Sequence, residues 1–399
     1  MAVTAPALTP ESIVRLEDAT LVMLDQRRLP GERVELRFDR WQDVIDAIRT
    51  MAVRGAPAIG VAAAYAVAMA AQRSPAGSLE GLREDVERAC VGLAAARPTA
   101  VNLAWAVDRM RETAAAPYAG PDELREALVE RASAIHADEV ERCRRIGEHG
   151  AELLRAGAQV LTHCNAGALA TGGYGTALGI IRSAHRRDPR LHVWVDETRP
   201  LLQGARLTAW ELEQAGVPHT LIPDVAAGSL MRRGEVDVVI VGADRVAANG
   251  DTANKVGTYP LSVLAARHGI PFLVCAPTSS IDLDTEDGDG IEIEERPADE
   301  VLMIRGVSIA PAGTNVRNPA FDVTPAELIS GIVTEEGVVS APFGPGLAGA
   351  VASAKERWAA TRPPIVPAPT TDEAPPPDTA PPRDTTPAAE AAPAAEVAG

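Results

Sequence analysis

A cysteine and an aspartate each follow a short apolar run of this chain. Cys164 comes shortly after the run 158–161, and Asp244 comes shortly after the run 236–242. Such runs are typical of buried parallel strands, whose carboxyl ends meet at one edge of a sheet. A thiol and a carboxyl group at that edge can transfer protons to and from a bound molecule. The sequence therefore predicts an enzyme with Cys164 and Asp244 as its catalytic pair.

The segment after Cys164 is rich in glycine and leads into a predicted helix near 173–187. Its glycines are Gly167, Gly172, Gly173 and Gly175. A strand, a glycine-rich loop and a helix N-terminus together often bind phosphate, because glycine lets the backbone approach an anion. We expect a phosphate cradle here, and a tight connection without a ligand is the alternative. The amides of the loop would also favour the thiolate form of Cys164.

A nicotinamide dinucleotide site is another interpretation of the same loop. Gly173, Gly175 and Gly179 almost form the pattern G-x-G-x-x-G, but the last gap is one residue too long. Asp196 lies about where an acid that binds a ribose would be expected. The dinucleotide pattern, however, needs its glycines directly after the strand, and residues 164–171 intervene here. The sequence therefore predicts no redox cofactor.

Basic residues next to glycine or proline turns could bind the phosphate of a substrate. Arg54 precedes a predicted helix start at Pro57, where an arginine and free amides together suit an anion. Lys255 opens the helix that follows the second apolar run. Arg97 and Arg199 lie at similar turns. Each of these residues taken alone is more often a solvated surface charge.

Composition and spacing exclude several other kinds of protein. The four cysteines form no C-x-x-C pair and the seven histidines show no H-x-x-H spacing, so no metal site is predicted. The formal net charge of −17 argues against non-specific nucleic-acid binding. Residues 1–10 lack a signal-peptide pattern, and the longest apolar stretch, 56–71, is short for a bilayer span. Few cysteines suit a reducing cytosol, so we expect a cytoplasmic protein without a membrane partner.

The predicted secondary structure of the chain changes near residue 158. Before it, a β-hairpin over 21–40 precedes a series of predicted helices, which are 43–51, 56–72, 79–96, 101–115 and 123–155. After it, short apolar runs alternate with helices, which implies an α/β fold with a doubly wound parallel sheet. The expected strands are 158–163, 191–195, 218–222, 236–241, 271–275 and 301–304.

These patterns predict three parts of the chain. Residues 1–157 form a mostly helical N-terminal domain with a small hairpin, and residues 158–362 form the sheet domain. Residues 363–399 are rich in Pro, Ala, Thr and acids and have almost no large apolar side chains. Such a composition cannot bury enough surface to offset its ordering entropy, so we expect this tail to be disordered.

Seven segments, in the same order along the chain, resemble the methylthioribose-1-phosphate isomerase family. They are 54–60, 97–103, 163–167, 196–212, 242–245, 254–258 and 318–325. The resemblance extends from about residue 10 to about residue 355, and the tail lies outside it. This family shares its fold with ribose-1,5-bisphosphate isomerases and with the α, β and δ subunits of a translation-initiation-factor exchange complex.

The resemblance implies a helical N-terminal domain, a Rossmann-like C-terminal domain and usually a homodimer. It also implies an aldose–ketose isomerase of methionine salvage, which converts 5-methylthioribose 1-phosphate to 5-methylthioribulose 1-phosphate without a cofactor. Cys164 and Asp244 match the catalytic pair of the family. The positions that match its substrate-binding residues are Arg54, Gly55, Ala56, Arg97, Gln203, Asn254 and Lys255.

Two other functions compete with this interpretation. A ribose-1,5-bisphosphate isomerase would need a second phosphate clamp where a methylthio group needs an apolar wall. The segments 203–212 and 291–296 look more like the methylthioribose enzyme. A regulatory subunit of the translation factor would have no use for Cys164 and Asp244, so the presence of both argues against that function.

Overall fold

A computed structural model describes residues 8–97 and 100–361, and every structural statement below concerns these residues. The tail that the sequence predicts to be disordered, 363–399, lies outside them. Within the described ranges, none of the helices combines the length and the apolar character that a bilayer span requires.

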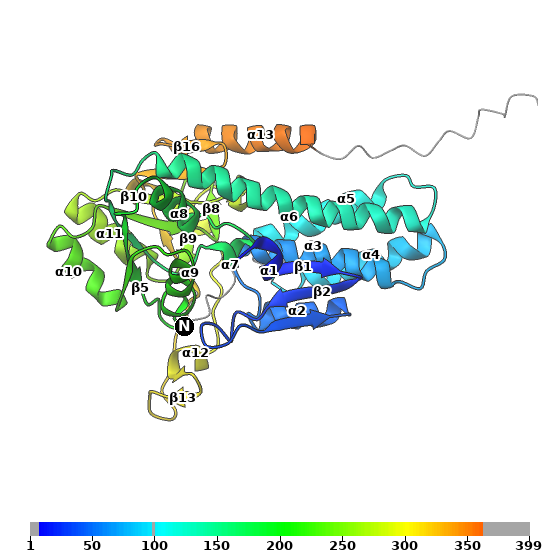
Figure 1. Cartoon of the computed structure of the whole chain (residues 1–399), viewed down its shortest axis with the longest axis horizontal. Coiled ribbons are helices and arrows are strands. Elements are labelled where there is room, and N and C mark those ends of the chain that lie inside the picture. The colour runs from blue at the N-terminus through cyan, green and yellow to red at the C-terminus, as the bar shows by residue number, and fades with distance from the viewer. Residues whose placement is uncertain (1–7, 98–99, 362–399) are drawn as a thin grey trace, which may run out of the picture. The chain divides into compact units, whose positions relative to one another are not determined.

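The first part of the described chain is mostly helical (Figure 1). After the short helix α1 (Pro10–Ile13), three strands form an antiparallel sheet in the order β1-β2-β3, namely β1 (Val14–Glu17), β2 (Thr20–Leu24) and β3 (Glu35–Phe38). The expected hairpin corresponds to β2 and β3, and β1 is an additional strand. The five expected helices are present as α2 (Trp41–Arg49), α3 (Ala56–Arg73), α4 (Leu79–Ala94), α5 (Val101–Ala115) and α6 (Pro121–Ala151).

Helix α3 is the centre of this helical part. It is apolar on every side and rich in alanine and glycine, and the side chains of nearly all its residues are buried. Small residues let the neighbouring helices approach closely: a β-carbon on Gly60 would lie 2.7 Å from the carbonyl oxygen of Asn102 in α5. The stretch that is too short for a membrane is therefore a core helix, as its length and composition predict.

The second part of the chain contains a seven-stranded sheet in the order β16-β15-β10-β7-β4-β5-β6. Its strands are β4 (Gln159–Thr162), β5 (His192–Asp196), β6 (His219–Ile222), β7 (Val238–Gly242), β10 (Phe272–Cys275), β15 (Gly331–Thr334) and β16 (Gly337–Val339). All neighbouring pairs are parallel except β15 and β16. The predicted doubly wound parallel sheet is confirmed.

Alternate residues of each strand pack against helices on opposite faces of this sheet. In β7, Val238 and Ile240 share a core with α6 and α8 (Ala177–Arg187). Val239 and Val241 share the other core with three helices, which are α10 (Ala227–Arg232), α11 (Thr258–His268) and α13 (Phe343–Thr361). Burial on both faces explains why these strands are continuous apolar runs and not alternating ones. Helix α6 contacts both α3 and α8, so it links the helical part to the sheet.

One expected strand does not belong to the main sheet, and two of its strands were not expected. The run 301–304 contributes β12 (Met303–Ile304), which pairs only with β13 (Val307–Ser308) in a separate hairpin. Arg305 and Gly306 between them have positive φ values of 51° and 79°, so the chain turns back at once. The strands of the main sheet that the sequence analysis missed are β15 and β16, both of which begin with glycine.

A four-stranded sheet, in the order β11-β8-β9-β14, lies beyond the carboxyl end of β7. Its strands are β8 (Arg245–Ala247), β9 (Thr252–Lys255), β11 (Ile281–Asp282) and β14 (Phe321–Thr324). Because β8 begins directly after Asp244 and β9 ends at Lys255, this small sheet fixes the spacing of those two residues.

Candidate active site

All nine residues that the sequence assigns to the site line one cavity. They are Cys164, Asp244, Arg54, Gly55, Ala56, Arg97, Gln203, Asn254 and Lys255. The cavity lies beyond the carboxyl ends of β4 and β7, the position at which parallel sheets bind their ligands. Its empty space, the open mouth included, is about 820 Å³.

Cys164 is held in an unusual backbone conformation. Its φ of 64° lies in the left-handed region, which costs energy for any residue with a β-carbon. Two threonines of other segments fix it there. The amide N–H of Cys164 donates to Oγ1 of Thr198 (2.8 Å), and its carbonyl oxygen accepts from Oγ1 of Thr208 (2.6 Å). The thiol therefore has a defined direction at the end of β4.

The thiol of Cys164 holds its proton more firmly than the sequence analysis predicts from the amides of the loop. Burial raises the pKa of Cys164, although Arg54 and Lys255 oppose the shift, and the nearby Asp244 raises the pKa further. The expectation of a stabilised thiolate is wrong, because removal from water outweighs the two cations and the amide of Asn165. The group that faces the cavity is a thiol that holds its proton.

Asp244 behaves as the sequence predicts. Burial raises the pKa of its carboxyl group, against the opposing charges of Lys255, Arg97 and Arg54. Its amide N–H donates to the carbonyl oxygen of Ala253 in β9 (2.9 Å), which fixes the residue next to the small sheet. A carboxyl group with a raised pKa is suited to donate a proton.

Lys255 lies at the end of β9 with its ammonium group in the cavity wall. The Nζ atom donates to the carbonyl oxygen of Ala320 (2.7 Å) and lies 4.9 Å from the ring centroid of Phe321. Burial lowers the pKa of Lys255, while Cys164 and Asp244 raise it. A buried ammonium group with one hydrogen-bond acceptor keeps donors available for an anion.

The start of α3 and the residue before it offer a second group of donors. Arg54 donates from Nη1 to Oδ1 of Asn165 (2.6 Å) and from Nη2 to its carbonyl oxygen (2.5 Å), so its guanidinium group is fixed. Gly55 has a φ of 94°, and a β-carbon there would lie 2.4 Å from the carbonyl oxygen of Ala170. Helix α3 has no acidic residue in its first turn, and its N-terminus lines the cavity. This arrangement is suited to bind an anion.

Arg97 belongs to a network of charges that the sequence analysis did not assign to the site. Its Nη2 donates to Oε2 of Glu294 (2.8 Å), and Arg296 donates from Nη1 to Oε1 of the same carboxylate (2.8 Å). Arg296 and Glu300 also line the cavity. The Nε atom of Arg97 is buried without a partner among the described residues.

Gln203 and Asn254 place amide groups in the cavity wall. Both side chains are buried. The Oε1 atom of Gln203 has no hydrogen-bond partner in the described part of the chain, and such a buried acceptor is costly unless a ligand or water satisfies it. Nδ2 of Asn254 donates to Oγ1 of Thr258 at the start of α11 (3.0 Å), which orients the amide.

The glycines after Cys164 do not serve as a phosphate cradle. None of the four is among the described residues that line the cavity. A β-carbon on Gly173 would lie 2.4 Å from Cγ2 of Val140 in α6, and one on Gly175 would lie 2.7 Å from Cα of Gly167. The alternative, a tight strand-to-helix connection, is therefore the correct interpretation. Arg199 is not a lining residue either, and its guanidinium group donates to the carbonyl oxygens of Pro200 and Val301.

One buried carboxylate holds this glycine-rich loop in place. Glu211 in α9 (Ala209–Gln214) is fully buried and accepts hydrogen bonds from the amides of Ala168 (2.8 Å) and Leu169 (3.2 Å). It also accepts from Nδ2 of Asn165 (3.0 Å) and from Nη2 of Arg182 (2.8 Å). Glu211 thereby fixes Asn165, which in turn fixes Arg54 in the cavity.

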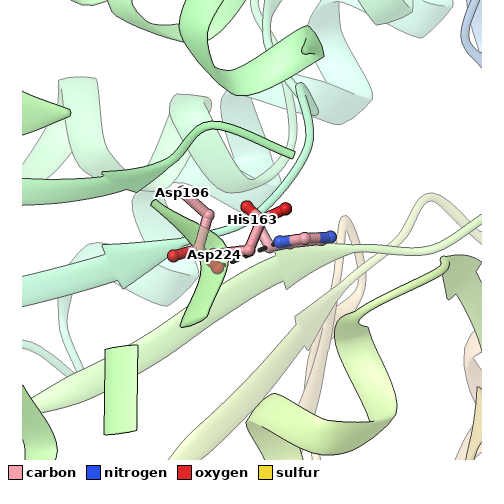
Figure 2. Close-up of side chains that lie close together, drawn as sticks. All are labelled: His163, Asp196 and Asp224. Carbon is pink, nitrogen blue, oxygen red and sulfur yellow. Dashed lines mark hydrogen bonds and ion pairs between the residues drawn. The ribbon is translucent and has the colours of Figure 1, made fainter. Parts of the chain in front are cut away.

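A cluster of one histidine and two aspartates includes the residue directly before Cys164. Figure 2 shows His163, Asp196 and Asp224, whose ligand-type atoms all lie within 4.8 Å of one another. No spacing in the sequence reveals this group, because its members follow β4, end β5 and begin the turn before α10. Nδ1 of His163 and Oδ2 of Asp196 are 3.0 Å apart, and Asp224 accepts the amides of Thr198 and Arg199. The ring of His163 already has a hydrogen-bond partner in Asp196, and Asp224 already accepts two backbone amides. These contacts favour a hydrogen-bonded network over a bound ion.

Residues 52–341 match the initiation factor 2 subunit family. The chain belongs to the initiation factor 2 subunit family. A member of it from Geobacter sulfurreducens, named methylthioribose-1-phosphate isomerase, is 54% identical over 340 residues, which is 85% of this chain and 98% of the relative.

Two solved structures of the initiation factor 2 subunit family have the same fold. A 5-methylthioribose 1-phosphate isomerase from Pyrococcus horikoshii is 44% identical and superimposes with a TM-score of 0.79, covering 87% of this chain and 99% of that chain. A protein from A. fulgidus, described as the delta subunit of the translation initiation factor eIF-2B, is 41% identical with a TM-score of 0.76 and covers 85% of this chain and 98% of that chain.

Sequence reasoning left out several residues that complete the cavity of this family member. Arg296 lines the cavity, and Glu294 accepts hydrogen bonds from Arg97 and Arg296. Both lie in the segment 291–296, which supported the resemblance but was not assigned to the site. Phe321 lies in another such segment. His163 and Asn165 flank Cys164 directly. In each case the signal was membership of a matching segment, and what was missing was the direction of the side chain.

Proposed function

We propose that this chain is an isomerase that converts 5-methylthioribose 1-phosphate to 5-methylthioribulose 1-phosphate in methionine salvage. The observation that carries this proposal is that a thiol and a carboxyl group, both of raised pKa, share one cavity with fixed cations and an anion-binding helix start. The relative from Geobacter sulfurreducens that is named methylthioribose-1-phosphate isomerase, 54% identical over nearly its whole length, supports this reaction.

The reaction requires two proton movements and the transfer of one hydrogen. The phosphate on C1 blocks ordinary opening of the sugar ring, so the ring oxygen must be protonated as its bond to C1 breaks. The hydroxyl on C2 must lose its proton as a ketone forms there, and the hydrogen on C2 must move to C1. Substrate and product have the same oxidation state overall, so no redox cofactor is consumed.

The catalytic pair can serve these movements. We assign to Asp244 the donation of a proton to the ring oxygen, because its raised pKa keeps the carboxyl group protonated over a wider pH range. We assign to Cys164 assistance at C1 and C2, either as a neutral thiol beside a hydride that moves directly, or as a thiolate that takes the proton from C2 and delivers it to C1, a route in which the thiol must first pass its own proton to solvent. Both routes balance, and both need the thiol at the position that the end of β4 gives it.

The phosphate is assigned to the cationic side of the cavity. Arg54 and Lys255 supply positive charge, and Gly55 and Ala56 supply the amide end of α3. Gln203, whose Oε1 is buried and unpartnered, is assigned to a sugar hydroxyl, because a hydroxyl group can donate to it. Asn254 and Arg97 complete the polar wall.

An apolar part of the cavity wall supports the methylthio substrate. Met51 and Leu201 line both this cavity and an adjoining hollow whose wall includes Leu207, Met303 and Ile304. A sulfur-bearing methyl group gains free energy against such a surface. Arg27 and Arg305 also line the hollow, so the choice between the two substrates is left to the experiment below. Arg206, which also lines the hollow, donates to the backbone carbonyl oxygens of Leu201, Gln26 and Arg27.

We also propose that the protein is a cytoplasmic homodimer. Its four cysteines are all free, which agrees with a reducing compartment. Strand β6 is the last strand on its side of the sheet, and Leu221 on it and Val225 just after it expose large apolar side chains. Sedimentation of the purified protein across a range of concentrations tests the oligomeric state.

The deciding experiment compares two substrates with the purified full-length protein. We expect turnover of 5-methylthioribose 1-phosphate, followed by nuclear magnetic resonance as the C2 ketone appears, with a kcat/KM at least about 100-fold above that for ribose 1,5-bisphosphate. Preference for the bisphosphate would establish the other isomerase. Failure to turn over either sugar phosphate, in a folded protein, would favour a regulatory subunit. The double variant Cys164→Ser with Asp244→Asn, whose turnover should fall by about 10²-fold or more, is the control of low activity.

A further inference from the structure

His163 joins three segments that carry residues of the proposed site. It precedes Cys164 directly, and its buried ring spans the gap between the end of β5 and the turn after Lys255. Nδ1 of the ring lies 3.0 Å from Oδ2 of Asp196, and Nε2 lies 3.0 Å from the carbonyl oxygen of Val256. The ring thereby bonds both neighbouring segments to the one that holds the thiol.

The turn after Lys255 is shaped to receive this ring. Gly257 has a φ of 105°, and a β-carbon there would lie 2.8 Å from Cε1 and 2.9 Å from Nε2 of His163. Only glycine combines that conformation with that approach. The contact between His163 and Val256 is therefore a close packing that any side chain at position 257 would break.

Asp196, the partner of His163, is also linked to Cys164 through the side chain of Thr198. The hydroxyl group of Thr198 donates to the carbonyl oxygen of Asp196 (3.1 Å) and accepts the amide N–H of Cys164 (2.8 Å). Thr198 also has a positive φ of 65°, and Asp224 accepts its amide N–H (2.6 Å). The left-handed backbone of Cys164 therefore depends on the position of Asp196.

The hydrogen-bond partners fix where the protons of the pair lie. A carbonyl oxygen can only accept, so Nε2 of His163 must donate to Val256. A second proton must then lie between Nδ1 and Oδ2 of Asp196, whichever of the two atoms it is bonded to. Without it, a lone pair of the ring would face a buried carboxylate whose other oxygen, Oδ1, has no partner among the described residues.

From these contacts we propose that His163 and Asp196 form a proton-sharing clamp that positions Cys164 and Lys255 for the isomerase reaction. The proposal rests on the proposed function for the identity of that reaction. His163 also lines the cavity, but neither residue of the clamp is assigned a contact with substrate. Both act through the backbone of the segments that they join. Removal of the shared proton or of either partner should let the thiol and the ammonium group drift apart.

The charged groups around the clamp favour retention of its proton. Burial opposes a charge on His163, but the hydrogen bond and charge of Asp196 and the charge of Asp224 raise the pKa of the ring overall. Burial raises the pKa of Asp196 to about 6, and the nearby carboxylates of Asp224 and Glu197 act in the same direction. From the side of β14, Asp322 also faces His163. Since a raised pKa means that the proton is lost only at higher pH, the clamp should open on the alkaline side.

Two substitutions at one position separate the shared proton from the hydrogen bond. The amide of Asp196→Asn can donate to Nδ1 of a neutral ring, so this variant keeps the bond without a titrating proton. Asp196→Ala loses both. We expect Asp196→Asn to keep kcat within about threefold of the wild type at neutral pH. Asp196→Ala should lose about 10- to 100-fold, because small displacements of reacting groups are costly.

The pH profile is the readout that simple packing would not change. The alkaline fall of kcat should move to higher pH in Asp196→Asn relative to the wild type. Two substitutions of His163 should separate its two hydrogen bonds. His163→Gln keeps a donor near Val256 and should mainly lower kcat. His163→Asn keeps a donor near Asp196 and should mainly raise KM. His192→Gln, in the half-buried histidine at the other end of β5, is the matched control and should change neither constant.

A chemical readout keeps this test independent of the proposed function. Iodoacetamide should react first with Cys164, because the other three cysteines are buried. Mass spectrometry should show faster alkylation of Cys164 in Asp196→Ala and an unchanged rate in Asp196→Asn. If the wild type did not turn over the methylthio substrate but these rates differed as expected, the proposed function would fail and the clamp would stand.

Three results would overturn the clamp. Equal activity and alkylation rates in the wild type and a folded Asp196→Ala variant would reduce the pair to ordinary packing. An equal loss of kcat in Asp196→Asn and Asp196→Ala would mean that the charge of the carboxylate, and not the shared bond, is needed. Loss of wild-type turnover on treatment with a chelator, restored by Zn²⁺ or Mn²⁺, would replace the clamp with a metal site.

Discussion

Substitution of Glu211 by glutamine should damage both the stability and the site of this protein, although the side chain does not line the cavity. Each carboxylate oxygen of Glu211 accepts two donors: Oε1 accepts from Leu169 and Asn165, and Oε2 accepts from Ala168 and Arg182. In Glu211→Gln one oxygen becomes an amide group that itself donates. Whichever way the amide turns, two hydrogen bonds are lost and two pairs of donors face each other.

The magnitude follows from the burial of this residue. Glu211 has no exposed surface, and its ion-pair partner Arg182 is only 15% exposed, so solvent cannot replace the lost bonds. Removal of one partner from a buried ion pair costs about 3–5 kcal/mol. We expect Glu211→Gln to lower the free energy of unfolding by about that amount. Thermal denaturation should show a decrease of roughly 2–4 °C in Tm for each kcal/mol, the range for a domain of 150–250 residues.

The same substitution should reach the site through Asn165. Without its acceptor on Glu211, Nδ2 of Asn165 keeps only the weaker bond to Oγ1 of Thr208. Oδ1 of Asn165, one of the two oxygens that orient the guanidinium group of Arg54, then loses its fixed position. KM for the sugar phosphate should therefore rise in the fraction of enzyme that remains folded. Glu213→Gln, on the exposed side of the same helix, is the matched control and should leave Tm and KM unchanged.

An unchanged Tm in Glu211→Gln would refute this reasoning, because it would mean that the four donors find other acceptors. A lower Tm with an unchanged KM would separate the two effects. The loop would then be stabilised by Glu211, and the orientation of Arg54 would be set elsewhere.

Substitution of the catalytic pair should affect turnover and not binding: Cys164→Ser and Asp244→Asn should each lower kcat by about 10²-fold or more, and the double variant should be little worse than the poorer single one. Near-full turnover in either single variant would remove that residue from the mechanism. Neutral substitution of Arg54 or Lys255 should mainly raise KM, since each charge-assisted contact contributes about 1.5–3 kcal/mol; an unchanged KM in both variants would exclude them as phosphate ligands. Deletion of residues 365–399 should leave kcat and Tm nearly unchanged, and a loss above about tenfold, or 1.4 kcal/mol of barrier, would give the tail a role.

The residues at strand ends could be predicted from the sequence because their positions follow from a general rule. Cys164 and Asp244 come after two apolar runs, and the rule that parallel strands end at one edge brings them together. Arg54 was found for a related reason, since it lies next to the start of α3. Lys255 was expected to open a helix, but it ends strand β9, and helix α11 begins only at Thr258. Backbone topology determined all four positions.

Features that depend on what fills the space around a residue could not be predicted in this way. Glycine shows that the backbone needs room, but not whether a phosphate or another part of the protein occupies it; at Gly173 the occupant is Val140 of α6. The protonation of Cys164 was predicted wrongly for the same reason, because neighbouring amides are visible in the sequence and burial is not. The cluster of His163, Asp196 and Asp224 unites three segments that no spacing connects.

The contact between Arg54 and Asn165 makes the proposed activity a measure of how the two parts of the chain fit together. Arg54 precedes the first turn of the central helix α3, and Asn165 follows the strand that carries the thiol. Gly55, packed against Ala170, lies at the same junction. Neither part alone contains a complete set of phosphate donors and proton carriers. In increasing denaturant, turnover should therefore disappear as soon as this junction loosens, before the far-ultraviolet circular dichroism of the helices and the sheet has changed.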